Sequence, residues 1–549
     1  MARTEFGGTE DVHNIHLLLN FSEGSVGFES PDILADGVDG NDPVACRNQI
    51  APYIIDCLTW LILGPYNSYG LRFGQSGTQA FIRHKYLQHD DLAKKQETVY
   101  LFDTSKATIA IVFLNQFPYI GIRWHRLPWL LTEDSCYACY GGYAMGIQLE
   151  QLPISETERR IELCRTLMRR FAPEAGGMLI CSRISIYYLS GTLGIGLLWV
   201  PMAGEPVLMV RKGLERAKRE SPLSHILSFR SYKEIAALCA EAGSPLASVI
   251  AVDKNGFSWS MAEMLQEKLG AVSFVSCDAV LSRAKSVKSA WEMNKMRKAG
   301  DGLRRTLDDL LPARIHPGMS ELEIAHAYVA AAWECDNSGQ MRMNAHGEES
   351  YVGSVSAGDS GVYPTYYNGP LGYRGLHPAV PFMGNRERIW ERDMLLSTDL
   401  SFSFEGHHSD RTQTYWCGGP IPDAIMRPHQ ACVDIYMRVI EKLRPGTTPQ
   451  ELWVLSCELA EKSGYAEGFM GLGRDRVAFL GHGVGLTLDE YPAFARGFDE
   501  PLEEGMVVAI EPKIGIPGIG MVGVEHSLEI TPEGARSLTG DATEIILVG

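Results

Sequence analysis

Between about residue 150 and residue 285 the chain alternates between strand-like and helix-like patterns. Short apolar runs typical of buried strands occupy residues 197–200, 206–211, 248–253 and 272–275. Helical spacing of apolar residues occupies residues 156–170, 231–242 and 259–269. We also interpret residues 177–189 as a β-rich run that Ser190 and Gly191 close. Strands that alternate with helices in this way predict an α/β domain over residues 150–285.

The charged stretch over residues 283–305 predicts a helix that connects this domain to a second one, over residues 286–549. The second domain repeats one helix-start signal. A Pro-Gly turn is followed by a capping box, in which a Ser or Thr and a Glu three residues later satisfy free backbone NH groups. The two copies are residues 317–324 and 445–452. They predict two helices that begin alike and favour an internal duplication, although this signal is also common outside duplicated domains.

Residues 1–144 mix apolar clusters, turn residues and aromatic residues without a sustained period. We interpret them as an N-terminal extension of unknown role. One hypothesis is that Met145 is the natural start of the protein, which the mass of the native protein would test.

Composition narrows the class of protein. Acidic side chains outnumber basic ones by 67 to 50 and no basic run occurs, so we expect no nucleic-acid partner. The apolar stretches at residues 54–63 and 107–122 are too short to span a bilayer, so we expect no membrane partner. The Cys residues are scattered, and the close pair Cys136 and Cys139 lacks the second pair of a four-thiolate zinc site. We therefore predict a cytoplasmic protein with reduced thiols.

Candidate chemistry begins in residues 394–416, which read as two strands around a turn at Glu405 and Gly406. Asp399 and Asp410 lie nearly equally far from that turn, so the hairpin brings them roughly opposite one another on one face. Residues 506–525 repeat this geometry.

In the second hairpin Glu511 and Glu525 each lie seven residues from Gly518. Facing carboxylates inside apolar strands repel one another unless a cation lies between them. Four negative charges match two divalent ions, and manganese, iron, cobalt and zinc all accept such oxygen ligands. His482, which we expect to be exposed at a turn between Gly481 and Gly483, offers a nitrogen ligand.

In type, order and spacing this set resembles the five ligands of the pita-bread metallopeptidase family, which includes aminopeptidase P, prolidase and the metal-free creatinase. The matching residues are Asp399, Asp410, His482, Glu511 and Glu525. The resemblance covers residues 150–549. It implies a creatinase-like α/β N-terminal domain followed by an α+β pita-bread catalytic domain with an internal pseudo-two-fold duplication. Members of the family are commonly dimers, so we expect a homodimer.

The resemblance also implies a dinuclear centre that Asp410 and Glu525 bridge, with Asp399 on one ion and His482 and Glu511 on the other. The implied reaction is hydrolysis of a peptide bond near the N-terminus of a small peptide, often before proline, by a metal-bridging hydroxide. Glu511 is then the expected proton shuttle.

The sequence departs from the family pattern at three positions. The proline-specific branch has a substrate-binding His where this chain has Asp489, followed by Glu490. Gln413 replaces an expected Arg and Gly523 replaces an expected basic residue, so an ion pair behind the ligands is expected to be absent. A segment like the one at Asp489 occurs in the dimethylsulfoniopropionate lyase of the same family, in which an Asp is the base. The alternatives for Asp489 are therefore the base of a lyase that acts on a small zwitterion and a turn-forming residue beside Pro492.

His377 is the candidate nearest to the place of an upstream catalytic His in the family, and its alternative is a loop histidine. Other candidates for substrate contact are His346, His407 and His408. The Tyr-rich run over residues 363–373 is either a pocket wall or a packed loop. Besides a peptidase and a lyase, a binding module that keeps the fold without catalysis is a third hypothesis, and metal analysis would discriminate it.

Overall fold

The computed structural model of the protein describes residues 150–344 and 351–549, together with six short strands before them. The chain divides into two compact units, Met1–Leu149 and Glu150–Gly549. In the first unit two strands pair in parallel, β1 (Ile15–Leu17) and β2 (Leu71–Phe73). Four further strands form an antiparallel meander, β3 (Gln79–Lys85), β4 (Glu97–Asp103), β5 (Thr108–Leu114) and β6 (Gly121–Arg126). The sequence pattern predicted none of these strands. Cys136, Cys139 and Met145 lie outside the described residues.

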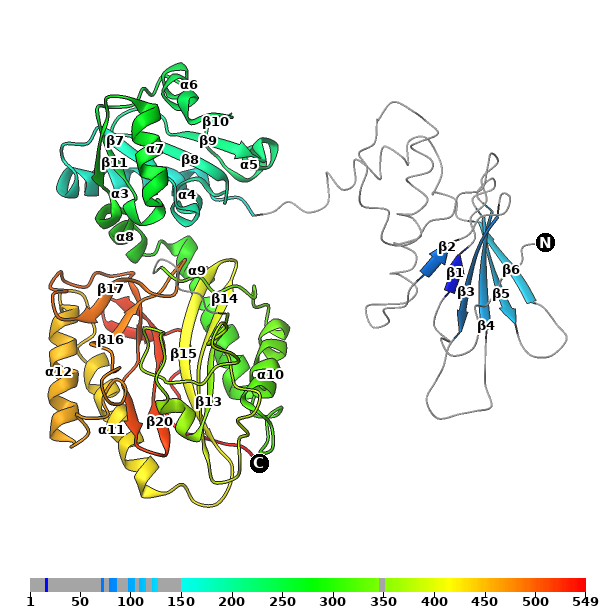
Figure 1. The fold of residues 1–549 in the computed structure, drawn as a ribbon, viewed down its shortest axis with the longest axis vertical. Helices are drawn as coiled ribbons and strands as arrows, with labels where there is room; N and C mark the ends of the chain where they lie inside the picture. Colours follow the sequence, from blue (N-terminus) through cyan, green and yellow to red (C-terminus); the bar gives the residue numbers. More distant parts are fainter. Residues whose placement is uncertain are drawn as a thin grey trace. The chain divides into compact units, whose positions relative to one another are not determined.

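The second unit begins with a mixed six-stranded sheet in the order β10-β9-β8-β7-β11-β12 (Figure 1). Its strands are β7 (Gly177–Ile180), β8 (Ile195–Pro201), β9 (Val207–Lys212), β10 (His225–Ser228), β11 (Val249–Val252) and β12 (Ser273–Ser276). Its helices are α3 (Ile154–Phe171), α4 (Arg183–Ser190), α5 (Leu214–Glu220), α6 (Ile235–Glu241), α7 (Trp259–Leu269) and α8 (Asp278–Ser286), with short 3-10 turns at Tyr232–Glu234 and Lys254–Gly256. This sheet with its helices is the predicted α/β domain.

Strand β8 shows why its sequence reads as a continuous apolar run. Successive side chains of a strand point to opposite faces of the sheet. Leu198 and Val200 belong to one buried cluster, and Leu197 and Trp199 belong to another. Helices cover both faces, so every position of the strand is apolar.

The expectation of a β-rich run over residues 177–189 was wrong beyond its first four residues. Strand β7 ends at Ile180, and helix α4 occupies most of the remainder. The buried carboxylate of Asp253 accepts hydrogen bonds from the backbone N–H groups of Cys181 (2.9 Å) and Ser182 (2.7 Å), which turns the chain out of the sheet. An apolar run that is buried on all sides does not by itself distinguish a strand from a helix.

The predicted single connecting helix over residues 283–305 is also interrupted. Helix α8 ends at Ser286, and α9 (Ala290–Arg304) begins after a capping box between Ser289 and Glu292. Between them Val287 forms an antiparallel bridge with Met506. This long-range pairing and the local cap break what the charge pattern presented as one helix.

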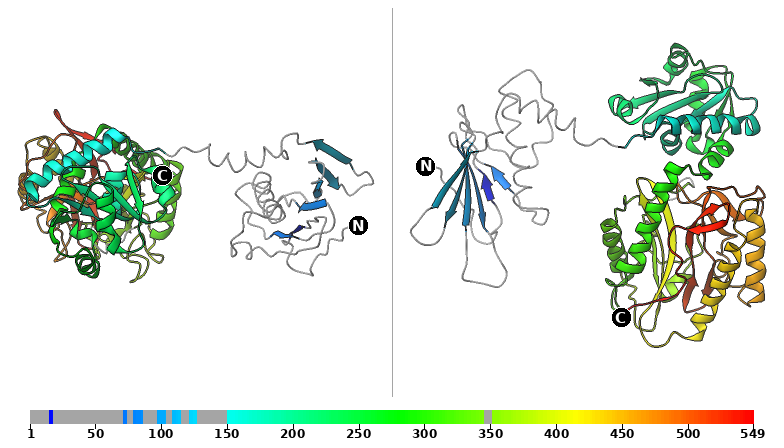
Figure 2. Two further views of the ribbon diagram at one scale, coloured as in Figure 1. Left: turned by 90° about the horizontal axis from the view of Figure 1, so that it is seen from above. Right: turned by 180° about the vertical axis from the view of Figure 1, so that it is seen from behind.

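The C-terminal domain consists of two similar halves whose strands face each other, with helices on the outside (Figures 1 and 2). The first half contains α9, a π-helical turn (Arg305–Leu310), α10 (Glu321–Glu334), β13 (Gly353–Ala357), a 3-10 turn (Gly358–Val362), β14 (Leu395–Phe404) and β15 (His407–Trp416). The second half contains α11 (Asp423–Ile440), α12 (Pro449–Lys462), β16 (Phe479–Gly483), β17 (Glu490–Ala495), β18 (Val507–Ile510), β19 (Lys513–Ile516), β20 (Gly520–Gly523), β21 (His526–Thr531), β22 (Gly534–Ser537) and β23 (Ile546–Leu547). The sheet orders are β13-β14-β15-β23 and β17-β16-β18-β21-β22, and β19 pairs with β20.

The repeated helix starts confirm the sequence prediction. Ser320 and Glu323 form a complete capping box at the start of α10, and Thr448 and Glu451 form another at the start of α12. Each helix lies in the corresponding half of the domain, in agreement with the predicted duplication. Among the described residues, no helix combines the length and the apolar character needed to cross a bilayer.

The domain also holds buried neutral histidines, of which His429 on α11 is one. Burial lowers the pKa of His429, its Nε2–H donates to the carbonyl oxygen of Thr543 (2.8 Å), and its Nδ1 has no hydrogen-bond partner. Protonation at Nδ1 would therefore place an unpaired charge in the interior.

We expect His429→Gln to make stability less dependent on pH below about pH 6.5, the unfolded-state pKa of His. The pKa of His429 is lower in the folded state than in the unfolded state. The neutral His429 therefore contributes its full stabilisation above the unfolded-state pKa, and this stabilisation is lost as the pH falls. The free energy of unfolding should change with pH less steeply than in the wild type, by up to about 1.4 kcal/mol per pH unit. Urea denaturation between about pH 7.5 and 5.5 measures this slope. His326→Gln, at an exposed position of α10, is the matched control. Equal slopes for wild type and His429→Gln would contradict this expectation.

Candidate metal centre

The first hairpin places two aspartates on one face. Glu405 and Gly406 form its turn with positive φ angles of 47° and 81°, as a tight two-residue turn requires. Asp399 pairs with Thr412, and Asp410 pairs with Ser401. The two aspartates are therefore diagonal neighbours on the same face. The prediction of a shared face is confirmed, but the residues are not directly opposite one another.

The second hairpin, β19 and β20, turns at Gly518, whose φ of 71° is in the left-handed region. Its ladder ends where Lys513 pairs with Gly523. Glu511 lies two residues before Lys513 and Glu525 lies two residues after Gly523, both just outside the paired strands. This symmetric position agrees with the geometry that the sequence predicted.

His482 comes from strand β16, between β17 and β18, and not from an exposed turn as predicted. The flanking glycines allow close contact between these strands. A Cβ at Gly481 would lie 2.0 Å from the carbonyl oxygen of Ala509, and one at Gly483 would lie 2.4 Å from that of Tyr491. The Nδ1–H of His482 donates to the carbonyl oxygen of Gly483 (3.1 Å), which assigns the proton to Nδ1 and leaves Nε2 as a potential ligand.

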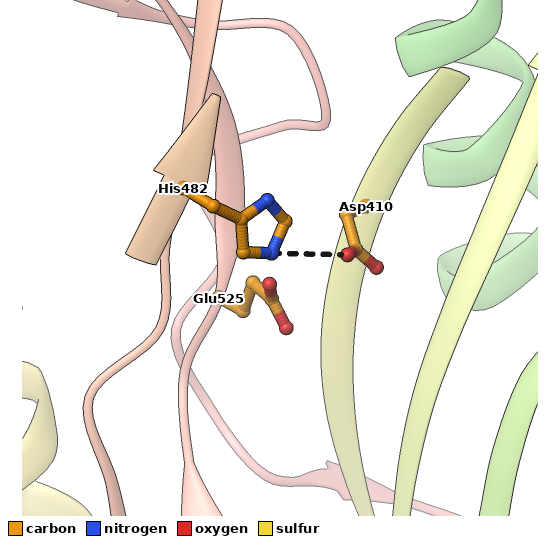
Figure 3. A group of neighbouring side chains, drawn as sticks. All are labelled: Asp410, His482 and Glu525. Atoms are coloured by element: carbon orange, nitrogen blue, oxygen red, sulfur yellow. Dashed lines mark ion pairs between the residues drawn. The ribbon is translucent and has the colours of Figure 1, made fainter. Parts of the chain in front are cut away.

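The predicted ligand side chains converge. The ligand atoms of Asp410, His482 and Glu525 lie within 4.8 Å of one another, and Figure 3 shows the imidazole directed at the two carboxylates. The ligand atoms of Asp399, Glu511 and Glu525 form a second such group. The Nε2 atom of His482 is 3.8 Å from Asp410 Oδ2 and 3.9 Å from Glu511 Oε1. The five residues thus come from two hairpins and a central strand to one place.

Lys513 is a member of this centre that the sequence analysis missed. Its side chain is fully buried, and its Nζ donates to Glu511 Oε2 (2.5 Å), Glu525 Oε2 (2.9 Å) and Asp399 Oδ2 (3.1 Å). A local signal was available, because Lys513 follows Glu511 by two residues, the spacing that keeps neighbouring side chains of a strand on one face.

Burial and mutual repulsion govern the charges of the centre. Burial raises the pKa of Asp410 to about 8, and Asp399 contributes to the same direction. Burial likewise raises the pKa of Glu525 far above its usual value. Burial alone would lower the pKa of Lys513 and of His482, but the surrounding carboxylates raise the pKa of both. The centre therefore favours bound positive charge.

Two groups of side chains at the centre could each hold a divalent ion. Asp410, His482 and Glu525 offer two carboxylates and an imidazole, a donor set suited to manganese, iron, cobalt or zinc. The second group already surrounds the ammonium of Lys513. The predicted pair of ions stays a prediction.

The ligands are held in place by neighbouring hydroxyl groups. Thr412 Oγ1 donates to Glu525 Oε2 (2.7 Å). Ser527 Oγ accepts from the backbone N–H of Asp410 (2.8 Å) and donates to its carbonyl oxygen (3.0 Å). These contacts tie the first hairpin to the strands that carry Glu525.

Gln413 and Gly523, the two departures from the family pattern behind the ligands, carry no charge and form no ion pair themselves. Gln413 instead accepts from Arg411 Nη2 (2.7 Å), and this Arg pairs with Asp308 (2.7 Å). Gly523 lies directly across the ladder from Lys513.

A small cavity lies at the centre, and Asp399 and Asp410 are among the residues that line it. Tyr367 and Tyr373 also line it. Of the two alternatives for the Tyr-rich run, the structure thus favours the pocket wall for these two residues. The remaining lining residues are Met341, Gly353, Ser354, Phe382, Ser401 and Leu488.

Asp489 follows the lining residue Leu488, and its Oδ1 accepts from the backbone N–H of Asn344 (2.5 Å). It also contributes to the raised pKa of His482, which places it near the same centre. Glu490 is instead buried in an ion pair with Lys288 (3.2 Å).

Three other histidine candidates, His377, His407 and His408, are not among the described residues that line the cavity. His377 is exposed in a small turn, where its Nδ1 accepts from the N–H of Ala379 (3.0 Å). His407 is buried, and burial lowers its pKa well below the usual value. His408 accepts from the backbone N–H of Arg342 (3.2 Å), and burial lowers its pKa to about 4. His346 lies outside the described residues.

Comparison with known proteins gives two family matches. Residues 294–532 match the model of metallopeptidase family M24, and residues 160–287 match the creatinase/prolidase N-terminal domain. The Xaa-Pro dipeptidase of Pyrococcus furiosus is 26% identical over 371 residues, which cover 67% of this chain and 94% of that protein.

Solved structures show the same fold. The prolidase of Pyrococcus horikoshii superposes with a TM-score of 0.58 at 23% identity, covering 71% of this chain and 100% of the prolidase. The dipeptidase PepE of Mycobacterium ulcerans gives a TM-score of 0.59 at 23% identity, covering 73% of this chain and 100% of PepE. These likenesses confirm the predicted fold class, a creatinase-like α/β domain followed by a pita-bread domain.

Proposed function

Since the chain belongs to metallopeptidase family M24 and carries the creatinase/prolidase N-terminal domain, we propose that it hydrolyses a peptide bond near the N-terminus of short peptides, with the Xaa-Pro specificity of prolidase and aminopeptidase P. The observation that carries this proposal is the convergence of Asp410, His482 and Glu525 beside a cavity. The metallopeptidases of the family use divalent metals, and these three residues would hold such an ion. When bound, the ion would polarise the scissile carbonyl group and lower the pKa of a water molecule.

Glu511 is the proposed proton shuttle. Lys513 holds its Oε2, and its Oε1 lies 3.9 Å from His482 Nε2, on the side of the candidate metal ligands. Burial raises the pKa of Glu511. A carboxyl group with a raised pKa can accept a proton near neutral pH and pass it to the leaving amine.

The cavity supports a small substrate. Tyr367 and Tyr373 provide aromatic walls, and Phe382 adds an apolar surface. Apolar rings suit the pyrrolidine ring of proline, and the carboxylates suit a substrate amine. A dipeptide or the first residues of a short peptide is therefore the proposed substrate.

We expect the purified protein, supplied with Mn²⁺ or Co²⁺, to release the N-terminal residue of Xaa-Pro dipeptides and of longer Xaa-Pro peptides. Dipeptides without proline are the matched controls, and a chelator should abolish turnover. Mass spectrometry of the products measures the result. Background rates on the whole panel with metal bound would refute the proposal.

The position of Asp489 favours one second candidate, a lyase that acts on a small zwitterion with Asp489 as base. The same panel should include dimethylsulfoniopropionate. Turnover of this compound that is lost in Asp489→Asn, at unchanged metal content, would favour the lyase. In the peptidase, neither Asp489 nor the exposed His377 has a proposed catalytic role.

The remaining expectations stay predictions. They are the cytoplasmic location, the homodimeric state and the choice among manganese, cobalt, iron and zinc. Size-exclusion chromatography with light scattering tests the second of these.

A further inference from the structure

The ammonium of Lys513 occupies one half of the centre. An ammonium group has three N–H donors, and here each has a carboxylate acceptor, from Asp399, Glu511 and Glu525, at 2.5–3.1 Å. These three carboxylates are also the second group of candidate metal ligands. A metal ion in that group would have to lie about 2.0–2.2 Å from the same oxygens, where the ammonium now lies.

The position of this ammonium is built into the hairpin. Lys513 is the first residue of β19, and its cross-strand partner is Gly523. A Cβ at Gly523 would lie 2.6 Å from Lys513 Cγ and 2.7 Å from the carbonyl oxygen of Pro512. The absence of a side chain at Gly523 therefore provides the space through which the Lys513 side chain reaches the carboxylates.

The lysine is also enclosed. Its side chain is 0% exposed and does not contribute to the cavity lining, whereas Asp399 and Asp410 do. The ammonium is thus enclosed and does not face the cavity. If the Lys513 side chain moved away, its ammonium and the three carboxylates would all lose their buried ion-pair partners. Because this loss is costly, Lys513 is a fixed part of the centre.

The charges favour the same conclusion. Four carboxylates carry four negative charges, which two divalent ions would neutralise in the dinuclear arrangement. With Lys513 in place, one divalent ion and one ammonium supply three positive charges. A second divalent ion would give the centre a net positive charge and would lie in contact with an ammonium, which like-charge repulsion opposes.

We propose that this centre takes a single divalent ion, held by Asp410, His482 and Glu525, and that the ammonium of Lys513 replaces the second ion of the dinuclear arrangement. This inference rests on the metal centre of the proposed function and not on the identity of the substrate. Lys513 is a positioning residue in this proposal, because it fixes Asp399, Glu511 and Glu525 by hydrogen bonds.

The test is metal stoichiometry, independent of activity. Full-length protein is dialysed to equilibrium against Mn²⁺, and the metal per chain is measured by plasma mass spectrometry together with the electron paramagnetic resonance spectrum. We expect one Mn²⁺ per wild-type chain, with the spectrum of an isolated ion. We expect Lys513→Gly to bind two Mn²⁺ per chain, with the spectrum of a magnetically coupled pair.

Lys288→Gly is the matched control, because Lys288 is also buried in an ion pair but its partner, Glu490, is not one of the candidate metal ligands. It should still bind one Mn²⁺ per chain. If Lys513→Gly does not fold, the wild-type stoichiometry alone decides the question.

Two coupled ions in the wild type would overturn this inference and leave the proposed peptidase intact. One ion per wild-type chain without any peptide hydrolysis would support the inference and refute the peptidase. Absence of bound metal in folded wild-type protein would overturn both.

Discussion

His482→Ala is expected to abolish peptide hydrolysis and to weaken metal binding by more than about 100-fold, since even partners behind a ligand contribute 10- to 100-fold. His482 is the nitrogen donor of the group that it forms with Asp410 and Glu525. Its loss leaves buried carboxylates whose pKa values burial already raises, so they would bind protons in place of the ion. Isothermal titration with Mn²⁺ and the release of the N-terminal residue from an Xaa-Pro peptide measure the two effects.

His326→Ala is the control for this prediction, because His326 is exposed on α10. It should bind metal and turn over substrate like the wild type. Retention of wild-type Mn²⁺ affinity in His482→Ala would show that the ion does not bind at this histidine, and the proposed centre would have to be abandoned.

Arg160→Met is expected to lower the free energy of unfolding by about 3–5 kcal/mol, the usual cost of removing one partner of a buried ion pair. The Arg160 side chain is 1% exposed and contacts Glu156 Oε1 (2.7 Å) and Glu292 Oε1 (3.2 Å). It also donates to the carbonyl oxygen of Tyr188 (2.6 Å). Its loss leaves two carboxylates buried without this partner, between α3 of the N-terminal domain and α9 of the catalytic domain.

The neighbouring arginine provides the matched control. Arg159 pairs with the same Glu156 (2.8 Å) and Glu292 (3.7 Å), but its side chain is 40% exposed. Water screens the charges of such an exposed ion pair, so Arg159→Met should lower the free energy of unfolding by no more than about 1 kcal/mol. Urea denaturation of both variants gives the comparison. Equal losses would mean that burial does not distinguish the two arginines and would contradict the argument.

Much of the centre could be predicted because the positions of its side chains depend on residues that are close in the sequence. A turn at Glu405 and Gly406 fixes the register of its hairpin, and register fixes which residues share a face. Asp399 and Asp410 therefore needed only their distances from the turn. The same holds for Glu511 and Glu525 around Gly518. The capping boxes of α10 and α12 are equally local, since all their hydrogen bonds lie within four residues.

The predictions that were wrong depended on contacts between distant parts of the chain. Asp253 turns the chain after Ile180, and Met506 pairs with Val287 to separate α8 from α9. His482 lies in a strand because β17 and β18 pair with it on both sides. None of these partners is visible in the hydrophobic pattern around the affected residues.

The amino-acid sequence by itself determined the order of the domains, the two hairpins and the five side chains that converge, because spacing along a strand and around a turn is a property of neighbouring residues. Only the tertiary structure decided what charge lies among those side chains. Lys513 contacts Asp399, a residue 114 positions away, as well as Glu525, which lies two residues beyond β20, and it reaches both through the space that Gly523 leaves. Residue types and their spacing indicate which carboxylates gather, whereas the cation that balances them depends on which distant side chain the packed hairpins enclose.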